Sequence, residues 1–202
     1  MREQEFDALL SIETVGDQKW FYPASHYHRY EPTPYAALEE LAAHYELKST
    51  DRLVDFGCGK GRVSFYMNHF QQASVIGVEM NEEFYQEALK NMKQYVEKHH
   101  KRRDDIYFHL GLAQEYPVHP EDNRFYFFNP FSMPIFMKVI SNILLSVEDS
   151  PREVELILYY ATEEYTYFLD DQTAFELKEE VRLNNLYEKN PYEKFLIYKL
   201  NI

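Results

Sequence analysis

The fold of this chain is decided by the stretch Leu53-Val54-Asp55-Phe56-Gly57-Cys58-Gly59-Lys60-Gly61-Arg62-Val63. A short apolar run reaches Asp55, three glycines then alternate with other residues, and a helical pattern follows. This order predicts a buried strand, a tight glycine turn and the start of a helix. Because glycine adopts backbone conformations that other residues avoid, such a turn lets backbone N–H groups and a helix N-terminus approach a ligand closely.

On both sides of this turn, strand-like and helix-like patterns alternate. Helices are predicted near residues 34–45, 63–70, 82–98 and 133–147, and strands near residues 53–56, 73–79, 106–110, 124–128 and 154–160. This alternation predicts an α/β fold with a doubly wound, mostly parallel sheet that has helices on both faces. Two further strands, at residues 174–183 and 192–201, are joined by a polar segment and predict a C-terminal antiparallel hairpin.

The 202 residues allow one domain with a real core. We divide the chain into residues 1–32, an N-terminal aromatic-rich extension packed on the domain, and residues 33–202, the α/β domain itself. The extension contains a group of aromatic and histidine residues, namely Trp20, Phe21, Tyr22, His26, Tyr27, His28 and Tyr30. These side chains either cover a hydrophobic surface or line a site, and packing is the favoured interpretation.

The composition excludes several classes of protein. Hydrophobic residues make up 45% and aromatic residues 17% of the chain, which argues against disorder. No apolar run approaches the ~20 residues of a membrane span, and the acidic N-terminus is not a secretory signal. The single cysteine, Cys58, excludes an internal disulfide framework and a cysteine-rich metal site. His26 and His28 alone form too weak a pattern to indicate a metal site, so we expect no metal. The absence of a membrane span, a secretory signal and a disulfide framework leads us to expect a cytoplasmic protein.

The formal net charge of −13 leads to an expectation about partners. Such a surface repels a nucleic acid unless its charge is strongly segregated, so nucleic acid is disfavoured as a partner. A basic protein or a small amine is favoured instead. No oligomeric state is predicted.

Polar residues end four of the predicted strands, and ligands bind at the carboxyl ends of strands in a doubly wound sheet. The four stops are Asp55 with its glycine turn, Glu79, the Ala113-Gln114 region, and Asn129-Pro130-Phe131. The glycine spacing Gly57-x-Gly59-x-Gly61 is neither the GxGxxG of dinucleotide sites nor a phosphate-binding P-loop. Glu79 follows Gly61 by 18 residues, which suits a carboxylate that accepts hydrogen bonds from two ribose hydroxyls.

The run from Asp55 to Gly61 resembles the first motif of the class I S-adenosylmethionine-dependent methyltransferases. The resemblance covers about residues 33–160 and implies a Rossmann-like, seven-stranded sheet whose last strand is antiparallel. It implies that S-adenosylmethionine is the cofactor and S-adenosylhomocysteine the product. It also implies a set of cofactor-binding residues around the glycine turn, on the ribose and at the adenine: Asp55, Phe56, Gly57, Cys58, Gly59, Gly61, Glu79, Met80, Ala113, Gln114 and Asn129.

The segment Asn129-Pro130-Phe131 is similar to the Asn-Pro-Pro-aromatic motif of methyltransferases that act on nitrogen, with one proline fewer. This similarity implies that the Asn129 amide and the Pro130 carbonyl accept hydrogen bonds from the target N–H, and that Phe131 stacks on the target. These three residues are therefore the predicted catalytic set. The alternative is a simple turn that ends the strand.

Residues just before the first domain helix close over the methionine end of the cofactor in relatives of this architecture. Tyr30, Thr33 and Tyr35 occupy that place here and are predicted to contact cofactor or substrate. The predicted activity is methyl transfer to a nitrogen of a protein or small-molecule acceptor. Two alternatives are a non-catalytic, cofactor-binding interaction module and, less favoured, a nicotinamide-dependent oxidoreductase.

Overall fold

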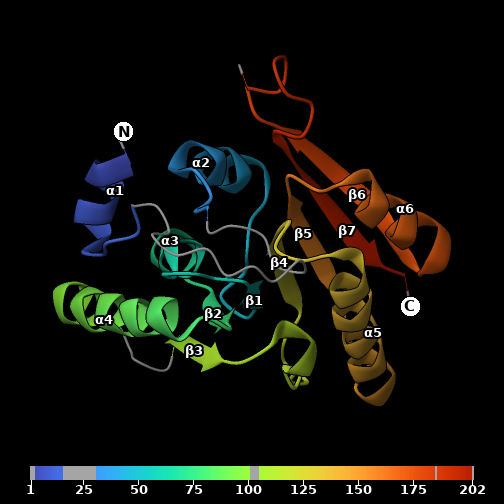
Figure 1. Ribbon diagram of the computed structural model, residues 1–202, viewed down its shortest axis with the longest axis horizontal. Coiled ribbons are helices and arrows are strands. Elements are labelled where there is room, and N and C mark those ends of the chain that lie inside the picture. The colour runs from blue at the N-terminus through green and yellow to red at the C-terminus, as the bar shows by residue number, and fades with distance from the viewer. Residues whose placement is uncertain (1–2, 16–30, 101–104, 185, 202) are drawn as a thin grey trace.

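The computed structural model describes residues 3–15, 31–100, 105–184 and 186–201. A seven-stranded sheet in the order β3-β2-β1-β4-β5-β7-β6 runs through it (Figure 1). Its strands are β1 (Arg52–Phe56), β2 (Ser74–Glu79), β3 (Ile106–Leu110), β4 (Arg124–Phe128), β5 (Glu155–Tyr159), β6 (Phe175–Arg182) and β7 (Lys194–Leu200). The first five strands are parallel, and β7 pairs antiparallel with both β5 and β6. The predicted Rossmann-like fold with a C-terminal antiparallel hairpin is confirmed.

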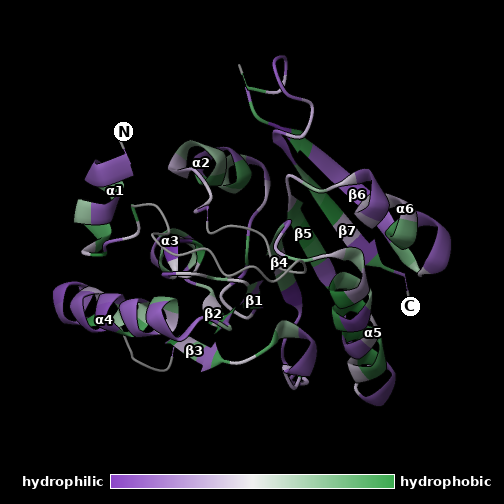
Figure 2. Ribbon diagram, viewed as in Figure 1, coloured by the Kyte–Doolittle hydropathy of each residue, from purple (hydrophilic) through white to green (hydrophobic). Residues whose placement is uncertain are grey.

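Helices cover both faces of this sheet. They are α1 (Glu3–Leu10), α2 (Tyr35–His44), α3 (Arg62–Gln71), α4 (Glu82–His99), the short 3₁₀ helix η2 (Ala113–Glu115), α5 (Met133–Asp149) and α6 (Glu163–Gln172). The first four pack against one face and the last three against the other. Figure 2 shows the apolar colour on β5 and in bands along α5, whereas α4 is largely hydrophilic. Helix α6 is absent from the sequence prediction, because its ten residues bury apolar side chains only at Tyr165, Phe168 and Leu169.

Successive side chains of β1 point to opposite faces of the sheet, so this short strand contributes to the hydrophobic cores on both faces. Leu53 packs with the helices α1–α4, whereas Val54 and Phe56 pack with α5 and α6. Asp55 lies between Val54 and Phe56, so its carboxylate is on the α3 side, where the Ser64 hydroxyl lies 3.5 Å away. The register pairs Asp55 with Gly77 of β2 and Tyr126 of β4, which places this buried carboxylate near the middle of the sheet.

The N-terminal residues contribute a helix, α1, that the sequence pattern did not predict. Its Phe6 is buried and stacks on Tyr35 of α2, with ring centroids 4.5 Å apart. The aromatic and histidine residues noted in the extension, from Trp20 to Tyr30, lie outside the described residues. The domain boundary at residue 33 therefore stays a prediction.

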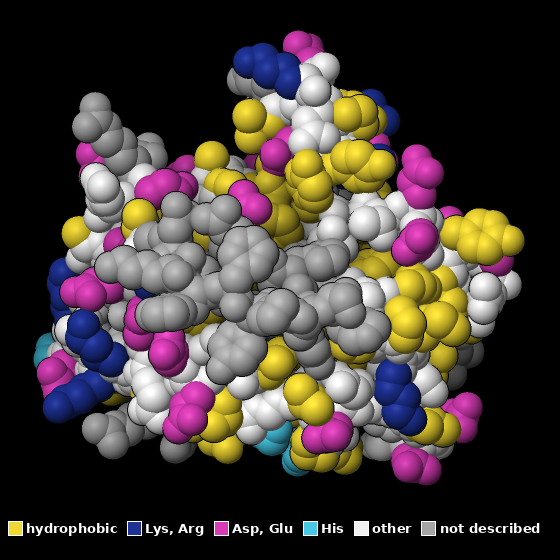
Figure 3. Space-filling model, viewed as in Figure 1, with side chains coloured by type: hydrophobic (Ala, Val, Ile, Leu, Met, Phe, Trp, Pro, Cys, Tyr) yellow, Lys and Arg dark blue, Asp and Glu magenta, His cyan; other side chains and the backbone are white. Residues whose placement is uncertain are grey.

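Surface charge is unevenly distributed. In Figure 3 the lysine and arginine side chains gather in separate groups, including one near α4 and one on the loop between β6 and β7, with acidic side chains spread between them. None of the described helices is long and apolar enough to cross a membrane.

The glycine turn supplies the first testable prediction. Gly61 has a φ of +88°, and a Cβ added to it would lie 2.7 Å from the Phe108 ring. We expect Gly61→Ala to lower the free energy of unfolding by at least ~2 kcal/mol, from backbone strain and overpacking together. Urea unfolding followed by circular dichroism measures the change.

Gly111→Ala is the matched control. A Cβ at Gly111 would meet the His109 imidazole, a side chain that can rotate away, and the Gly111 backbone lies outside the left-handed region. Equal losses for the two variants would contradict the conformational argument at Gly61.

Candidate functional site

The glycine turn is fixed to the end of β2 by backbone hydrogen bonds. The Gly57 and Cys58 N–H groups donate to the Val78 carbonyl, at 2.9 and 3.1 Å. All three glycines of the turn have positive φ, at +78°, +54° and +88°, a conformation that glycine adopts without steric cost. The turn therefore brings its backbone directly against the strand that carries Glu79.

Glu79 is the residue around which this site is built. One carboxylate oxygen accepts from the Gly59 N–H and the other from the Asn81 N–H, both at 2.8 Å. The residue is only 7% exposed. A carboxylate offers about four acceptor positions, so these two bonds leave capacity for a ligand that donates hydrogen bonds. This is the geometry that a ribose role for Glu79 needs.

Two buried acidic side chains lie together in this part of the site. Burial, and then the nearby Glu79 charge, raises the pKa of Asp55 to about 8. Burial also raises the pKa of Glu79, while the backbone N–H groups of Asn81 and Gly59 oppose that rise. A cation bound beside them would favour ionisation of both groups, so the pair suits a positively charged ligand.

Cys58 lies within the turn as a packing residue. Its Sγ would be 2.7 Å from a Cβ added at Gly77, and burial raises the pKa of its thiol well above the usual value. A thiol that stays protonated is a poor nucleophile, which agrees with a structural role. No group of three or more metal-ligating side chains occurs among the described residues.

The segment Asn129-Pro130, which follows β4, packs directly against the glycine turn. A Cβ added to Gly57 would be 3.1 Å from the Pro130 Cβ, so Pro130 packs against the turn itself. Asn129, one residue earlier, has a φ of +38°, a conformation that few residues other than glycine, asparagine and aspartate adopt readily. The structure thus brings together the glycine turn, Glu79 and the Asn129-Pro130 segment, which come from three strands.

Phe131 corrects the predicted catalytic set. Its ring is 4% exposed and belongs to the core beneath α5 and α6. Its carbonyl accepts a hydrogen bond of 2.6 Å from the Tyr165 hydroxyl. Stacking on an acceptor would require the ring to leave this core, so we remove Phe131 from the proposed catalytic residues.

The predicted adenine contacts lie after β2 and β3. Met80 is 41% exposed beside Glu79, and Ala113 is buried at the start of η2. The Gln114 carbonyl accepts from the Asn142 amide at 2.8 Å, and the Gln114 Oε1 is buried with no hydrogen-bond partner among the described residues. An adenine amino group is a donor of the kind that this oxygen lacks. These contacts stay predictions.

Two of the three residues predicted near the methionine end have other partners. The Thr33 hydroxyl lies 2.8 Å from the Tyr126 hydroxyl, and both side chains are buried. Tyr35 is fully buried and its hydroxyl donates to Asp7 at 2.6 Å. We therefore assign both to packing and leave them out of the proposed site. Tyr30 lies outside the described residues.

Arg62 is a residue of this region that we did not single out from the sequence. It follows the turn directly, is 3% exposed, and its guanidinium donates to Thr14, Thr33 and Glu3. The same group lies 4.4 Å from the Tyr35 ring centroid. Its position directly after the last glycine was the only feature of the sequence that could have drawn attention to Arg62. The fold shows that this side chain joins the N-terminal segments to the turn.

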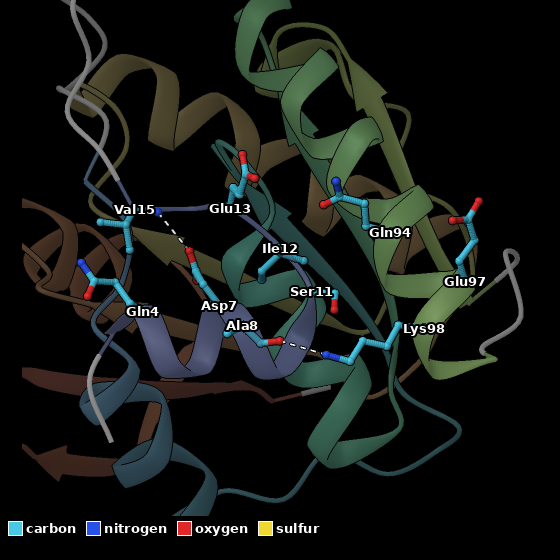
Figure 4. A pocket seen from close by; sticks show the side chains of 10 residues that line it. All are labelled: Gln4, Asp7, Ala8, Ser11, Ile12, Glu13, Val15, Gln94, Glu97 and Lys98. Atoms are coloured by element: carbon cyan, nitrogen blue, oxygen red, sulfur yellow. Dashed lines mark hydrogen bonds between the residues drawn. The ribbon is translucent and has the colours of Figure 1, made fainter.

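A separate groove lies between α1 and α4 (Figure 4). Its lining is mixed, with polar and apolar surface: Gln4, Asp7, Ala8, Ser11, Ile12, Glu13, Val15, Gln94, Glu97 and Lys98. The Lys98 ammonium crosses it to donate to the Ala8 carbonyl at 3.1 Å. Neither the glycine turn nor Asn129 lines this groove, so it is not part of the candidate site.

The Asp55 carboxyl gives a prediction about pH. Its pKa rises from about 3.8 to about 8 on folding, so between these values the folded chain keeps a proton that the unfolded chain releases. The free energy of unfolding therefore falls as the pH rises, by up to ~1.4 kcal/mol per pH unit. In ligand-free protein, Asp55→Asn should remove this contribution to the pH dependence of the free energy of unfolding. Relative to the wild type, the variant should therefore become more stable as the pH rises towards 8.

Urea unfolding from pH 5 to 8.5 measures this effect, with Asp171→Asn on the exposed side of α6 as the control. Parallel pH profiles for wild type and Asp55→Asn would show that Asp55 is ionised in the folded chain.

Comparison with known proteins adds the family. The family described as "Methyltransferase domain" matches residues 47–193, most of the chain. No curated protein sequence matches. The structure resembles a proposed RNA methyltransferase from Pyrococcus horikoshii, with 16% identity, all of both chains covered and a TM-score of 0.60.

Two further structures share the fold. An RNA methyltransferase from Salinibacter ruber, solved with S-adenosylhomocysteine, has 17% identity and a TM-score of 0.54, over 84% of this chain and 92% of that one. A precorrin-6y C5,15-methyltransferase from Geobacter metallireducens has 15% identity and a TM-score of 0.54, over 83% and 86%. At these identities the likeness concerns the fold.

The expectation about partners is wrong. The net charge led us to disfavour nucleic acid and to favour a protein or small amine, yet chains of this fold include RNA methyltransferases. The error has a physical reason, because a net charge is a sum over the whole surface and does not describe the local field at one site.

The family match also decides between the predicted activities. It favours the methyltransferase over the nicotinamide-dependent oxidoreductase and over a module without catalysis. The chain belongs to the methyltransferase-domain family and is a class I enzyme that uses S-adenosylmethionine as its methyl donor.

Proposed function

We propose that this enzyme transfers the methyl group of S-adenosylmethionine to a nitrogen of an RNA nucleotide, held at Asn129 and Pro130. The observation that carries the proposal is the contact of Pro130 with Gly57, which sets the end of β4 against the turn that accommodates the methionine part of the donor. The RNA acceptor is supported by the likeness to RNA methyltransferases over most or all of the chain.

On the donor side, the proposed contacts follow from hydrogen-bond capacity. The free acceptor positions of Glu79 take the two ribose hydroxyls, and the Gln114 Oε1 takes the adenine amino group. Met80 and Ala113 border the adenine. The Asp55 and Glu79 carboxylates favour a positively charged ligand, and the donor carries both a sulfonium and an ammonium group.

On the acceptor side, the chain has to orient a nitrogen rather than activate a methyl group. S-adenosylmethionine supplies a methyl group that its sulfonium has already activated. The Asn129 amide oxygen and the Pro130 carbonyl accept hydrogen bonds from the target N–H, which aligns the nitrogen lone pair with the methyl group. Asn129 has a positive φ, and the burial of Phe131 fixes the end of the Asn129-Pro130 segment in the core.

Glu79→Gln tests the ribose contact. The amide has one acceptor oxygen in place of two and loses the charge that strengthens hydrogen bonds to hydroxyls, so we expect S-adenosylhomocysteine to bind at least tenfold more weakly. Isothermal titration calorimetry measures the affinity. Glu82→Gln, an exposed acid at the start of α4, is the control. Unchanged affinity in Glu79→Gln would remove Glu79 from the ribose role.

Asn129→Gly tests the acceptor contact, because glycine keeps the positive φ and loses only the side chain. We expect turnover to fall about 100-fold or more, as when a positioning group is lost, with S-adenosylhomocysteine affinity within a few-fold of wild type. The assay measures transfer of a radiolabelled methyl group to RNA from cells that lack this enzyme.

Nuclease and protease treatment of the labelled product identify the acceptor in the same assay. Label that resists ribonuclease but not protease would contradict the RNA acceptor. Wild-type turnover in Asn129→Gly would instead contradict the role of Asn129 and leave the acceptor class standing.

A further inference from the structure

An aromatic surface continues outward from the ends of β4 and β5. Phe128, the residue before Asn129, lies with its ring centroid 6.3 Å from that of Tyr160. Tyr160 in turn lies 5.5 Å from Tyr192, with an angle of 34° between the ring planes. Tyr192 is 40% exposed, and Tyr160 and Phe128 are partly exposed. Aromatic rings therefore lead from the proposed acceptor position to the loop between β6 and β7.

This loop is fastened to the sheet at Tyr160. The Asn190 side-chain amide donates to the Tyr160 hydroxyl at 2.6 Å, and the Tyr160 N–H donates to the Lys194 carbonyl at 3.2 Å. Tyr160 has a φ of +55°, an unusual conformation for an aromatic residue. The ring positions are thus set by specific bonds and are not a chance exposure of apolar side chains.

Positive side chains accompany these rings. The Arg182 guanidinium lies 4.7 Å from the centroid of Tyr187, and the Lys194 ammonium lies 5.7 Å from it. Lys189 is exposed on the same loop. Figure 3 shows hydrophobic and basic side chains side by side on the β6–β7 loop, at the top of the view.

The local charge differs from that of the chain as a whole. From residue 180 to residue 194, the three cations Arg182, Lys189 and Lys194 equal in number the three carboxylates Glu180, Glu188 and Glu193, so this hairpin is neutral in a chain whose net charge is −13. Glu180 on β6 pairs with both Arg182 and Lys194. Glu193 accepts a hydrogen bond from the Tyr159 hydroxyl at 2.6 Å.

We infer that the hairpin surface, formed by Tyr160, Tyr187, Tyr192, Arg182, Lys189 and Lys194, binds a single-stranded segment of the acceptor RNA next to the target nucleotide. Exposed rings stack on bases whatever their sequence, and the neighbouring cations meet the phosphates. A duplex would need a broad basic face, whereas a single strand needs only alternating rings and cations. The inference rests on the proposed RNA acceptor.

The test uses the full chain with a fluorescein-labelled, single-stranded RNA of mixed sequence, measured by fluorescence anisotropy. Tyr192→Ala should weaken RNA binding about tenfold, the effect of losing one base stack, and Tyr192→Phe should restore it. Lys189→Gln should weaken binding and lower the salt slope by about one. In the methylation assay, Tyr192→Ala should raise KM for RNA and leave kcat unchanged.

Tyr167→Ala is the matched control, since Tyr167 is 65% exposed on α6, against the other face of the sheet. Equal RNA affinity in wild type and Tyr192→Ala would overturn the hairpin surface while the RNA acceptor stands. Methylation of protein in place of RNA would overturn both. S-adenosylhomocysteine affinity, measured in parallel, shows that each variant is folded.

Discussion

The site depends on one carboxylate that is held by backbone N–H groups. Glu79 accepts from Gly59 and from Asn81, so it closes the glycine turn on one side and the start of α4 on the other. The turn meets it with three glycines at positive φ, and two of them, Gly57 and Gly61, pack without a Cβ against Pro130 and Phe108. Charge-assisted hydrogen bonds in a buried place are strong and directional, so this one side chain fixes how β1, β2 and the turn meet.

The same arrangement is electrostatically unfavourable in the free protein. Asp55 and Glu79 are both buried, and burial raises the pKa of each carboxyl, with the Glu79 charge adding to the rise at Asp55. A cationic ligand offsets part of this unfavourable term, whereas a neutral one does not. Ligand-binding sites often contain buried charged residues that the protein alone does not fully stabilise. A group whose hydrogen bonds are all made within the protein has none left for a ligand.

The sequence was most informative where the function of a residue depends on its immediate neighbours. The alternation of glycines indicated a tight turn, and the apolar run before Asp55 indicated a buried strand, so the turn, the sheet and the position of Glu79 could all be predicted. It was less informative for aromatic residues and for charge. Phe131 and Tyr35 are buried by contacts with α6 and α1, which lie far along the chain, and neither helix was predicted. The sum of charges likewise did not reveal that the cations Arg182, Lys189 and Lys194 lie beside partly exposed aromatic rings at the end of the β6–β7 hairpin.

Arg62 shows why the N-terminal segments belong with the site although they carry none of its proposed donor contacts. Its guanidinium is buried between Thr14 and the Thr33 carbonyl, and it lies over the Tyr35 ring. A buried arginine needs all its N–H groups satisfied, so these partners are drawn to the first residue of α3 and stay there. The helix that begins at the glycine turn is thereby tied to the N-terminal segments, while Glu79 holds the turn itself. A turn whose backbone is fixed by such contacts before binding loses little entropy when the methyl donor binds.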